Sequence, residues 1–328
     1  MTAFPRFVTA EAYAAAFADA DRWASTFRAV VADAGLGTVG SIDPVSSGTF
    51  PVAVCPTTGA GRVVVKVFAP DAPGVAYASA AELDAYRCFA GHDLPVPDLV
   101  AAGEVAPSGA DDRWPYLVLS ELPGTPWSGV ELAPAAERRL AAQLGEAVAQ
   151  IHAVDLGPGG TVLRDHVLLL AMLEDNRATA AATQLARGHL PPARCGELDA
   201  WLPPVSELVD PSIPARLVHA DLHRDHVFVD PATAELTGII DFADAVAGAV
   251  AYELAALHAG SFGCDRRLLD AFADGYGGTD PLDDRRLFAL ALLHGYDVLA
   301  GVAGPLALDQ VPSLDEAAAR FAGSLAPR

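Results

Sequence analysis

The chain has 328 residues, more than a single hydrophobic core usually serves, so the sequence predicts two lobes of about 100–200 residues each. Its 52% hydrophobic and 19% charged residues are typical of a globular protein and exclude a disordered one. Acidic residues outnumber basic ones by 42 to 21, which disfavours nucleic acid and anionic membranes as partners and favours a cationic small molecule, although solubility alone also explains an acidic surface.

The first third of the chain predicts a small lobe built on an antiparallel sheet. After an amphipathic helix over about 10–34, the β-rich runs VGSIDPVSSGTFPVAV and GRVVVKVFA are joined by the turn-forming PTTGAG into a hairpin. A helix over AYASAAELDAYRCFAG follows, DLPVPDLVAAGEV leads into a strand, and the apolar strand WPYLVLSELPG ends in a Pro-Gly break. We therefore expect an N-terminal lobe over 1–119 and a hinge over 120–124.

The remaining residues, 125–328, predict a larger and mostly helical lobe. Ala/Leu-rich segments such as APAAERRLAAQLGEAVAQIHAV repeat apolar residues at three- and four-residue steps. Two strand-like stretches interrupt the helices, ARLVHADL with HVFVD and then LTGIID, and the turn DPATAE joins them. The expected fold class is α+β, with a small antiparallel-sheet lobe followed by a mostly helical one.

The sequence shows neither a membrane span nor a cysteine motif. No stretch approaches the ~18 consecutive apolar residues of a span, and Glu11 and Asp19 lie where a signal peptide needs an apolar core. The four cysteines form no CxxC pair, which disfavours a zinc ribbon and a disulfide framework. We expect a cytoplasmic protein without nucleic-acid or membrane partners, present as a monomer or a weak dimer.

Lys66 is the only lysine in the chain. It lies in the apolar strand VVVKVF, where a compact ammonium can meet a phosphate oxygen and a carboxylate but a planar guanidinium would not fit. Glu82 lies in the helix that follows, and protein kinases position phosphates with a strand lysine paired to a helix glutamate. The alternative is a lysine that reaches solvent from a half-exposed strand, beside a solvated glutamate.

The segment LVHADLHRDHVFVDPATAELTGIIDFADA carries the strongest catalytic signal. Asp221 follows a strand-like run, and Asp241 ends the apolar run TGIID. Phosphoryl transfer needs two such carboxylates, one to accept the proton of the attacking hydroxyl and one to hold the metal that bridges the phosphates. A zinc site of His219, His223 and His226 with Asp221 is the alternative, although strand and loop space these histidines poorly and no cysteine lies nearby.

These segments resemble the aminoglycoside phosphotransferase family. HADLHRDH is similar to its HGDLHxxN signature, IIDFAD to its IDFxD motif and YLVLSELPG to its inter-lobe hinge, and the similarity runs from the hairpin near Ser46 to the helices near His294. The segments WPYLVLSELPGTPW, LDAWLPPV, VFVDPATAELTGIIDFADAVAG and LLHGYDVL most resemble hygromycin B phosphotransferases of the 7″-O-kinase type. The resemblance implies a protein-kinase-like fold and an O-kinase that uses ATP or GTP and Mg²⁺, with Mn²⁺ as the alternative metal.

The resemblance also assigns roles to single residues. Asp221 matches the catalytic base and Asp241 the metal-binding aspartate. Lys66 and Glu82 match the phosphate lysine and its partner. His226 stands at the second metal position, so the expected metal ligands are His226 and Asp241.

Nucleotide and substrate contacts are expected elsewhere in the chain. The hinge would offer the backbone of Ser120 and Leu122 to a purine, and the loop that contains Ser46 and Ser47 would position the nucleotide. Three acids of the second lobe are candidates for binding a cationic antibiotic, with ordinary helix-cap or surface roles as the alternative. These acids are Asp244, Asp265 and Asp297.

The chain departs from the family pattern at two places. His226 replaces the asparagine that most of the family uses as second metal ligand, and because Mg²⁺ prefers oxygen, an imidazole there alters metal affinity or preference. The only asparagine of the chain, Asn176, is remote in sequence. Where the family often has GDPxxDLA, this chain reads GAVAYELAA, in which Ala249 replaces one acid and Glu253 is the candidate substitute for the other.

Besides the zinc hydrolase that the alternative zinc site implies, three functions remain open for this sequence. Hygromycin B is the preferred substrate on the local resemblance. Macrolide phosphotransferases resemble this chain in carrying histidine at the position of His226, so a macrolide 2′-phosphotransferase is the alternative within the class. A nucleotide-binding regulator, or pseudokinase, in which the altered metal position has weakened transfer, is the alternative of another class.

Overall fold

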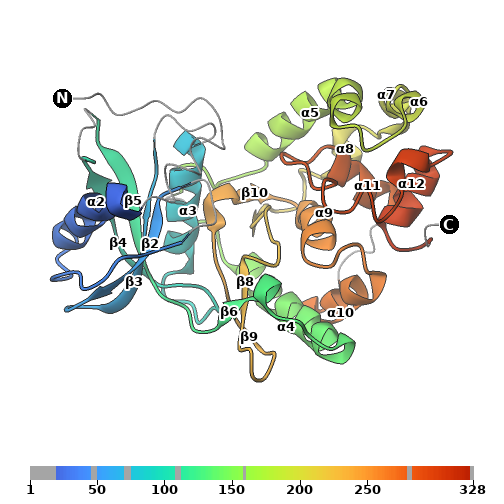
Figure 1. Ribbon diagram of the computed structural model, residues 1–328. Coiled ribbons are helices and arrows are strands. Elements are labelled where there is room, and N and C mark those ends of the chain that lie inside the picture. Colours follow the sequence, from blue (N-terminus) through green and yellow to red (C-terminus); the bar gives the residue numbers. More distant parts are fainter. Residues whose placement is uncertain are drawn as a thin grey trace. The chain divides into compact units, whose positions relative to one another are not determined.

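The structure is a computed structural model that describes residues 20–45, 50–69, 75–107, 112–157, 160–278 and 283–325 (Figure 1). The chain divides into two compact units, one of Met1–His92 with Val96–Leu122 and the other of Asp93–Pro95 with Pro123–Arg328. The hinge role of 120–124 stays a prediction. Among the described helices, none is both long enough and apolar enough to cross a membrane.

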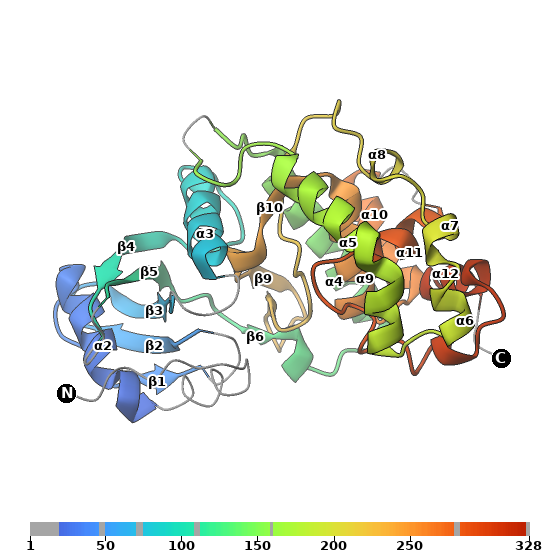
Figure 2. The same ribbon diagram turned by 90° about the horizontal axis from the view of Figure 1, so that it is seen from above.

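The first unit contains a five-stranded antiparallel sheet. Its strands are β1 Asp43–Pro44, β2 Val52–Thr57, β3 Gly61–Val67, β4 Leu99–Val105 and β5 Trp114–Ser120, in the order β1-β2-β3-β5-β4. Two helices, α2 Ala20–Asp33 and α3 Val75–Phe89, pack on this sheet (Figure 2). The Tyr116 hydroxyl of β5 donates a hydrogen bond to the Asp33 carboxylate at 2.6 Å, which ties the end of α2 to the sheet.

The predicted hairpin is the β2–β3 pair. Thr57 faces Gly61 across the turn 58–60, and Gly61 has a φ of 72°, which glycine adopts without steric cost. The predicted helix over 76–91 is α3, and the described part of the predicted helix over 10–34 is α2. Residues 10–19 of that prediction lie outside the described residues.

Short strands and longer helices make up the second unit. β7 Arg216–Val218 pairs with β10 Val246–Gly248, and β6 Thr125–Pro126, β8 Val227–Val229 and β9 Leu236–Ile239 form a three-stranded sheet in the order β6-β8-β9. The longer helices are α4 Pro134–Ala153, α5 Val167–Arg187, α9 Val250–Gly260, α10 Arg266–Tyr276, α11 Asp284–Leu292 and α12 Leu314–Phe321. Single turns are α6 Pro192–Cys195, α7 Leu198–Trp201 and α8 Val205–Leu208, with 3-10 turns η1 Trp127–Gly129, η2 Phe242–Asp244 and η3 Leu308–Gln310. The predicted α+β class is confirmed.

Helices α4 and α10 approach each other closely because glycines lie at their contact. A Cβ atom on Gly145 of α4 would lie 2.1 Å from the Phe272 carbonyl oxygen, and one on Gly275 of α10 would lie 2.0 Å from the Ala142 carbonyl oxygen. Real Cβ atoms do not approach backbone oxygens this closely, so both positions exclude any larger residue at the present helix spacing. The apolar face predicted for α4 is buried, as the sequence pattern requires: Leu140, Leu144, Val148 and Ile151.

We predict that Gly275→Ala destabilises the protein by about 1–3 kcal/mol, because the added methyl group forces the two helix backbones apart. Denaturant-induced unfolding measures this change. Gly301→Ala is the matched control, since a Cβ at Gly301 meets no atom within 4 Å. Equal stability of Gly275→Ala and the control would contradict the close contact of α4 with α10.

Candidate active site

Lys66 and Glu82 form a buried ion pair in the first unit. The Lys66 Nζ on β3 lies 2.6 Å from the Glu82 Oε2 on α3, and the two side chains are 6% and 1% exposed. The rings of Phe50 and Phe68 lie 5.1 Å and 5.3 Å from the ammonium. The structure therefore does not support the alternative of a lysine that reaches solvent. Removal of either partner would leave a buried charge without its counter-ion.

Two hydrogen bonds between Ser120 and Asp98 hold the end of β5 to the residue that precedes β4. The Ser120 N–H donates to the Asp98 carbonyl at 2.9 Å, and the Ser120 hydroxyl accepts the Asp98 N–H at 2.8 Å. Glu121 accepts hydrogen bonds from Arg62 at 2.5 Å and 2.9 Å. The purine contacts of Ser120 and Leu122 stay predictions, and the predicted nucleotide loop at 46–49 lies outside the described residues.

The HADLHRDH loop, residues 219–226, connects β7 to β8 and is held by a buried glutamate of α9. The Glu253 carboxylate accepts the His219 N–H at 2.6 Å and the Ala220 N–H at 3.3 Å, and it is 1% exposed. His152 Nε2 lies 3.6 Å from the same carboxylate. Burial alone would raise the pKa of Glu253, but the nearby His152 and His219, together with the hydrogen bond from the His219 N–H, outweigh it and lower that pKa. Glu253 thus serves the loop as an ionised acceptor.

Ala220 has the left-handed backbone that the loop requires. Its φ is 67°, in a region that costs a residue with a Cβ about 1–2 kcal/mol and that glycine adopts freely. The family signature HGDLHxxN has glycine here, so the conformation is retained without the residue best suited to it. The hydrogen bond from Ala220 N–H to Glu253 helps to hold this strained residue.

The hydrogen bonds of His219 assign its protons. The ring is 3% exposed, and its Nε2 lies 2.8 Å from the Ile240 carbonyl oxygen, which can only accept. The opposite nitrogen, Nδ1, accepts the Asp221 N–H at 3.3 Å. Nε2 therefore joins the loop to the end of β9, and Nδ1 holds the loop backbone itself. With both nitrogens used in this way, His219 has no lone pair for the zinc ion of the alternative interpretation.

His226 carries the opposite tautomer, and this prepares it to bind a cation. Its Nδ1 lies 2.7 Å from the Asp221 carbonyl oxygen and must donate, which leaves a lone pair on Nε2. That Nε2 lies 3.7 Å from the Asp241 Oδ2. Burial lowers the pKa of His226 to about 4, so the imidazole is neutral at neutral pH. A neutral nitrogen and a carboxylate that face each other fit a divalent metal ion.

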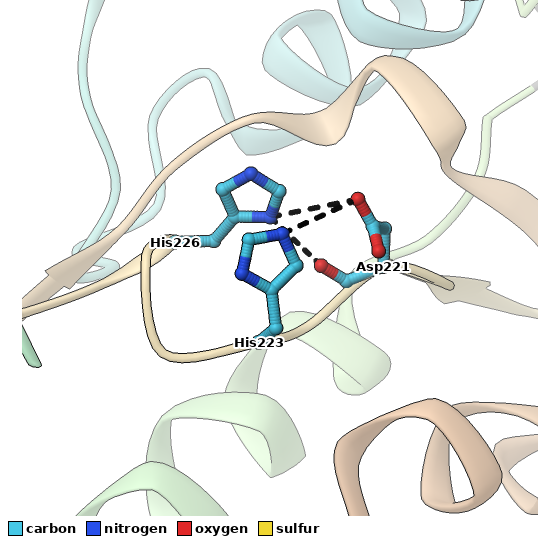
Figure 3. Close-up of side chains that lie close together, drawn as sticks. All are labelled: Asp221, His223 and His226. Carbon is cyan, nitrogen blue, oxygen red and sulfur yellow. Dashed lines mark hydrogen bonds and ion pairs between the residues drawn. The ribbon is translucent and has the colours of Figure 1, made fainter. Parts of the chain in front are cut away.

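Asp221 lies beside this pair, and its pKa is raised into the neutral range. Its side chain is 31% exposed, with His223 Nε2 3.6 Å from its carboxylate (Figure 3). Burial first, and then the negative charges of Asp244, Asp241 and Glu253, raise the pKa of Asp221 to about 8. A carboxylate of this kind is a suitable acceptor for a hydroxyl proton once a cation among the acids favours its charged form.

The side chains of Asp221, His223 and His226 form a second possible metal cluster, with ligand atoms within 4.8 Å of one another (Figure 3). The His226 nitrogen that lies 3.9 Å from the Asp221 carboxylate is Nδ1, which carries a proton. His223 Nδ1 accepts the Asp225 N–H at 3.2 Å, so the Nε2 that faces Asp221 carries the proton of the neutral ring. A zinc ion here would have to displace both protons, and the geometry favours the His226–Asp241 pair.

The three acids proposed as substrate contacts differ in their surroundings. Asp244 ends η2 close enough to Asp221 to raise the pKa of that carboxyl. Asp265 caps α10 by accepting the Arg267 N–H at 2.8 Å, and Asp297 lies 2.9 Å from His189 Nε2. The structure brings Asp244 to the site, and it shows structural contacts for the other two.

One residue of the HADLHRDH loop that we did not single out from the sequence is a structural anchor. The Arg224 guanidinium lies 4.3 Å from the centre of the Trp127 ring and donates to the Ser261 carbonyl at 2.7 Å and to Glu137 at 3.1 Å. These contacts join the loop to η1, to α4 and to the end of α9. The sequence shows an arginine within the motif, but it does not show which residues the arginine contacts, because those residues are distant in sequence.

Comparison with known proteins identifies the family and the fold. Residues 42–289 match the family described as "Phosphotransferase enzyme family". The GDP complex of wild-type aminoglycoside 2′-phosphotransferase-IIIa is 17% identical, with 93% of this chain and 100% of that chain covered and a TM-score of 0.59. A thermostable mutant of the aminoglycoside phosphotransferase APH(4)-Ia, in ternary complex with ADP and hygromycin B, is 19% identical (91% and 95% covered, TM-score 0.54). The macrolide 2′-phosphotransferase MphH from Brachybacterium faecium is 22% identical (93% and 100% covered, TM-score 0.55). At these identities the likeness shows the fold, and the predicted protein-kinase-like fold is confirmed.

We predict that Glu253→Gln weakens both the fold and the HADLHRDH loop. The amide keeps one acceptor oxygen but turns an NH₂ group toward a backbone N–H, so the protein should lose about 1–3 kcal/mol of stability. Because small displacements of reacting groups are costly, any turnover should fall by about 10–100-fold. Unfolding and steady-state kinetics measure the two effects, with Glu146→Gln, an exposed glutamate of α4, as control. Unchanged kinetics in Glu253→Gln would refute the positioning role.

Proposed function

The chain belongs to the phosphotransferase enzyme family, and on that premise we propose that it transfers the γ-phosphoryl group of ATP or GTP to a hydroxyl group of an aminoglycoside or aminocyclitol antibiotic. The observation that carries this proposal is the neutral Nε2 of His226 facing Asp241, with the Asp221 carboxylate beside them. Lys66, steadied by Glu82, is the proposed phosphate ligand. Family membership alone does not choose the acceptor, because one fold serves many substrates.

The proposed roles follow from the protonation states. Asp221 accepts the proton of the acceptor hydroxyl as its oxygen attacks the γ-phosphorus and the bond to the nucleotide diphosphate breaks. Asp241 and His226 would hold the divalent ion, which when bound neutralises charge on the phosphate oxygens. Because His226 offers nitrogen where Mg²⁺ prefers oxygen, we infer a metal preference displaced toward Mn²⁺.

We propose hygromycin B as the first acceptor to test. The local resemblance of LDAWLPPV and LLHGYDVL supports it, and so does the net charge of −21, which attracts a cation. A macrolide is the second candidate, favoured by the histidine at position 226. A cytoplasmic location and a monomeric or weakly dimeric state stay predictions.

We predict that Asp221→Asn reduces turnover by about 10²–10⁴-fold, since an amide cannot accept the hydroxyl proton. Nucleotide binding should persist, seen as an ATP- and metal-dependent rise in melting temperature. The assay is ADP release with hygromycin B, kanamycin, streptomycin or erythromycin as acceptor, and Asp199→Asn, an exposed acid of α7, is the control. Metal-dependent ATP binding by the wild-type protein without phosphorylation of any acceptor would favour the nucleotide-binding regulator instead.

We predict that His226→Asn increases the ratio of Mg²⁺-supported to Mn²⁺-supported activity by about tenfold, because the amide oxygen replaces a nitrogen ligand. Titration of kcat/KM with each metal measures the ratio. His223→Asn is the control and should leave it unchanged. Stoichiometric zinc in the purified protein, lost in both variants, would instead establish the Asp221, His223 and His226 cluster as the metal site.

A further inference from the structure

A half-exposed tyrosine lies beside the acids of the site, and the proposed chemistry does not use it. Tyr296 is 40% exposed, and its hydroxyl is hydrogen-bonded to the Asp244 side chain. Burial of the hydroxyl, followed by the charges of Asp244 and Asp221, raises the pKa of Tyr296, so the phenol remains a donor at neutral pH. Tyr296 thus combines an exposed side chain with a hydroxyl held by an acid of the site, and its exposed part is accessible to a ligand.

The turn that carries Tyr296 is fixed from one side by α9. The ring of Tyr252 stacks on that of His294, with centroids 4.5 Å apart and planes 6° apart. The Tyr252 hydroxyl accepts the Gly295 N–H at 3.1 Å, and the Tyr296 N–H donates to His294 Nδ1 at 3.2 Å. Tyr252 and His294 are both buried, so their stacked rings and these hydrogen bonds fix the backbone of the turn next to Tyr296.

The same turn is fixed from the other side by the end of α5. The Asp297 carboxylate lies 2.9 Å and 3.0 Å from His189 Nε2 through its two oxygens, and 3.6 Å from Arg187 Nε. The acid that the sequence suggested as a substrate contact thus anchors the turn. The neighbouring Tyr296 is exposed to solvent.

One helix positions both Tyr296 and the loop that carries Asp221, the proposed proton acceptor. Tyr252 and Glu253 are consecutive in α9, and the first supports the turn at 294–296 while the second holds the backbone of His219 and Ala220. Both supports are buried in the same helix. The distance of Tyr296 from Asp221 is therefore set by α9 rather than left to a loose loop.

An aromatic face next to a carboxylate recognises a particular chemistry. The face of a tyrosine attracts a cation through its ring quadrupole, and a nearby carboxylate adds an ion pair with the same cation. A protonated amine on a sugar or cyclitol ring satisfies both, with its ring carbons against the phenol. We propose that Tyr296, together with Asp244, binds the ammonium-bearing ring of the acceptor next to the hydroxyl that Asp221 deprotonates. This inference rests on the proposed function of the site.

The test is the acceptor KM of Tyr296→Ala. Loss of the ring should raise the KM for the cationic acceptor by about tenfold while kcat and the KM for ATP change by less than about threefold, since the contact is equally strong before and during transfer. Tyr296→Phe keeps the ring and should raise the KM by about threefold or less. Leu185→Ala, which truncates another exposed side chain of the second unit, is the control. Isothermal titration of hygromycin B into each variant gives the binding constant without turnover.

The outcomes separate the inference from the proposed function. Active wild-type protein with an unchanged acceptor KM and binding constant in Tyr296→Ala would overturn the role of Tyr296 and leave the kinase intact. Equal losses of kcat, ATP affinity and melting temperature would assign Tyr296 a structural role and also overturn it. Wild-type protein that neither binds nor phosphorylates any of the four antibiotics would refute the proposed function, and the inference with it.

Discussion

The buried carboxylate of Glu253 is the contact on which the site depends. It accepts two consecutive backbone N–H groups from the HADLHRDH loop and so holds Ala220 in a left-handed conformation. That conformation turns the next residue, Asp221, out of the strand direction of β7 and into the site. A buried ionised carboxylate is stable only where hydrogen bonds replace its hydration, and here the two backbone N–H groups of the loop provide them. Glu253, the candidate substitute for an acid of the family pattern, therefore supports the loop in this chain.

Proton positions then determine what the two loop histidines can do. His219 and His226 have similar sequence surroundings, yet one donates through Nε2 and the other through Nδ1. The first has no lone pair left for a ligand, because its Nδ1 accepts a backbone N–H. The second keeps a lone pair on Nε2, which lies 3.7 Å from the Asp241 carboxylate. Backbone carbonyls at Ile240 and Asp221 thus separate a structural histidine from a candidate metal ligand.

The α+β class and the pairing of Lys66 with Glu82 could be predicted from local patterns, whereas the protein-kinase-like fold was predicted from the resemblance to a family. A single lysine within an apolar strand and a glutamate on the next helix have few other ways to satisfy their charges when both elements pack together. The roles of Asp265 and Asp297 were harder to predict from the sequence, since the partner of a surface carboxylate depends on tertiary contacts. His189, which binds Asp297, lies 108 residues away in sequence. Tyr296 was missed for the same reason, as its neighbour Asp244 belongs to a different segment.

His226 Nε2 and Asp241 are proposed to bind a divalent cation that serves phosphoryl transfer beside Asp221. The most direct measurement is anomalous diffraction from crystals grown with Mn²⁺ and a non-hydrolysable ATP analogue. The account predicts a peak bonded to Nε2 of His226, to a carboxylate oxygen of Asp241 and to phosphate oxygens. A peak bonded instead to His223 and Asp221, or no peak at His226 with the analogue bound, would contradict it.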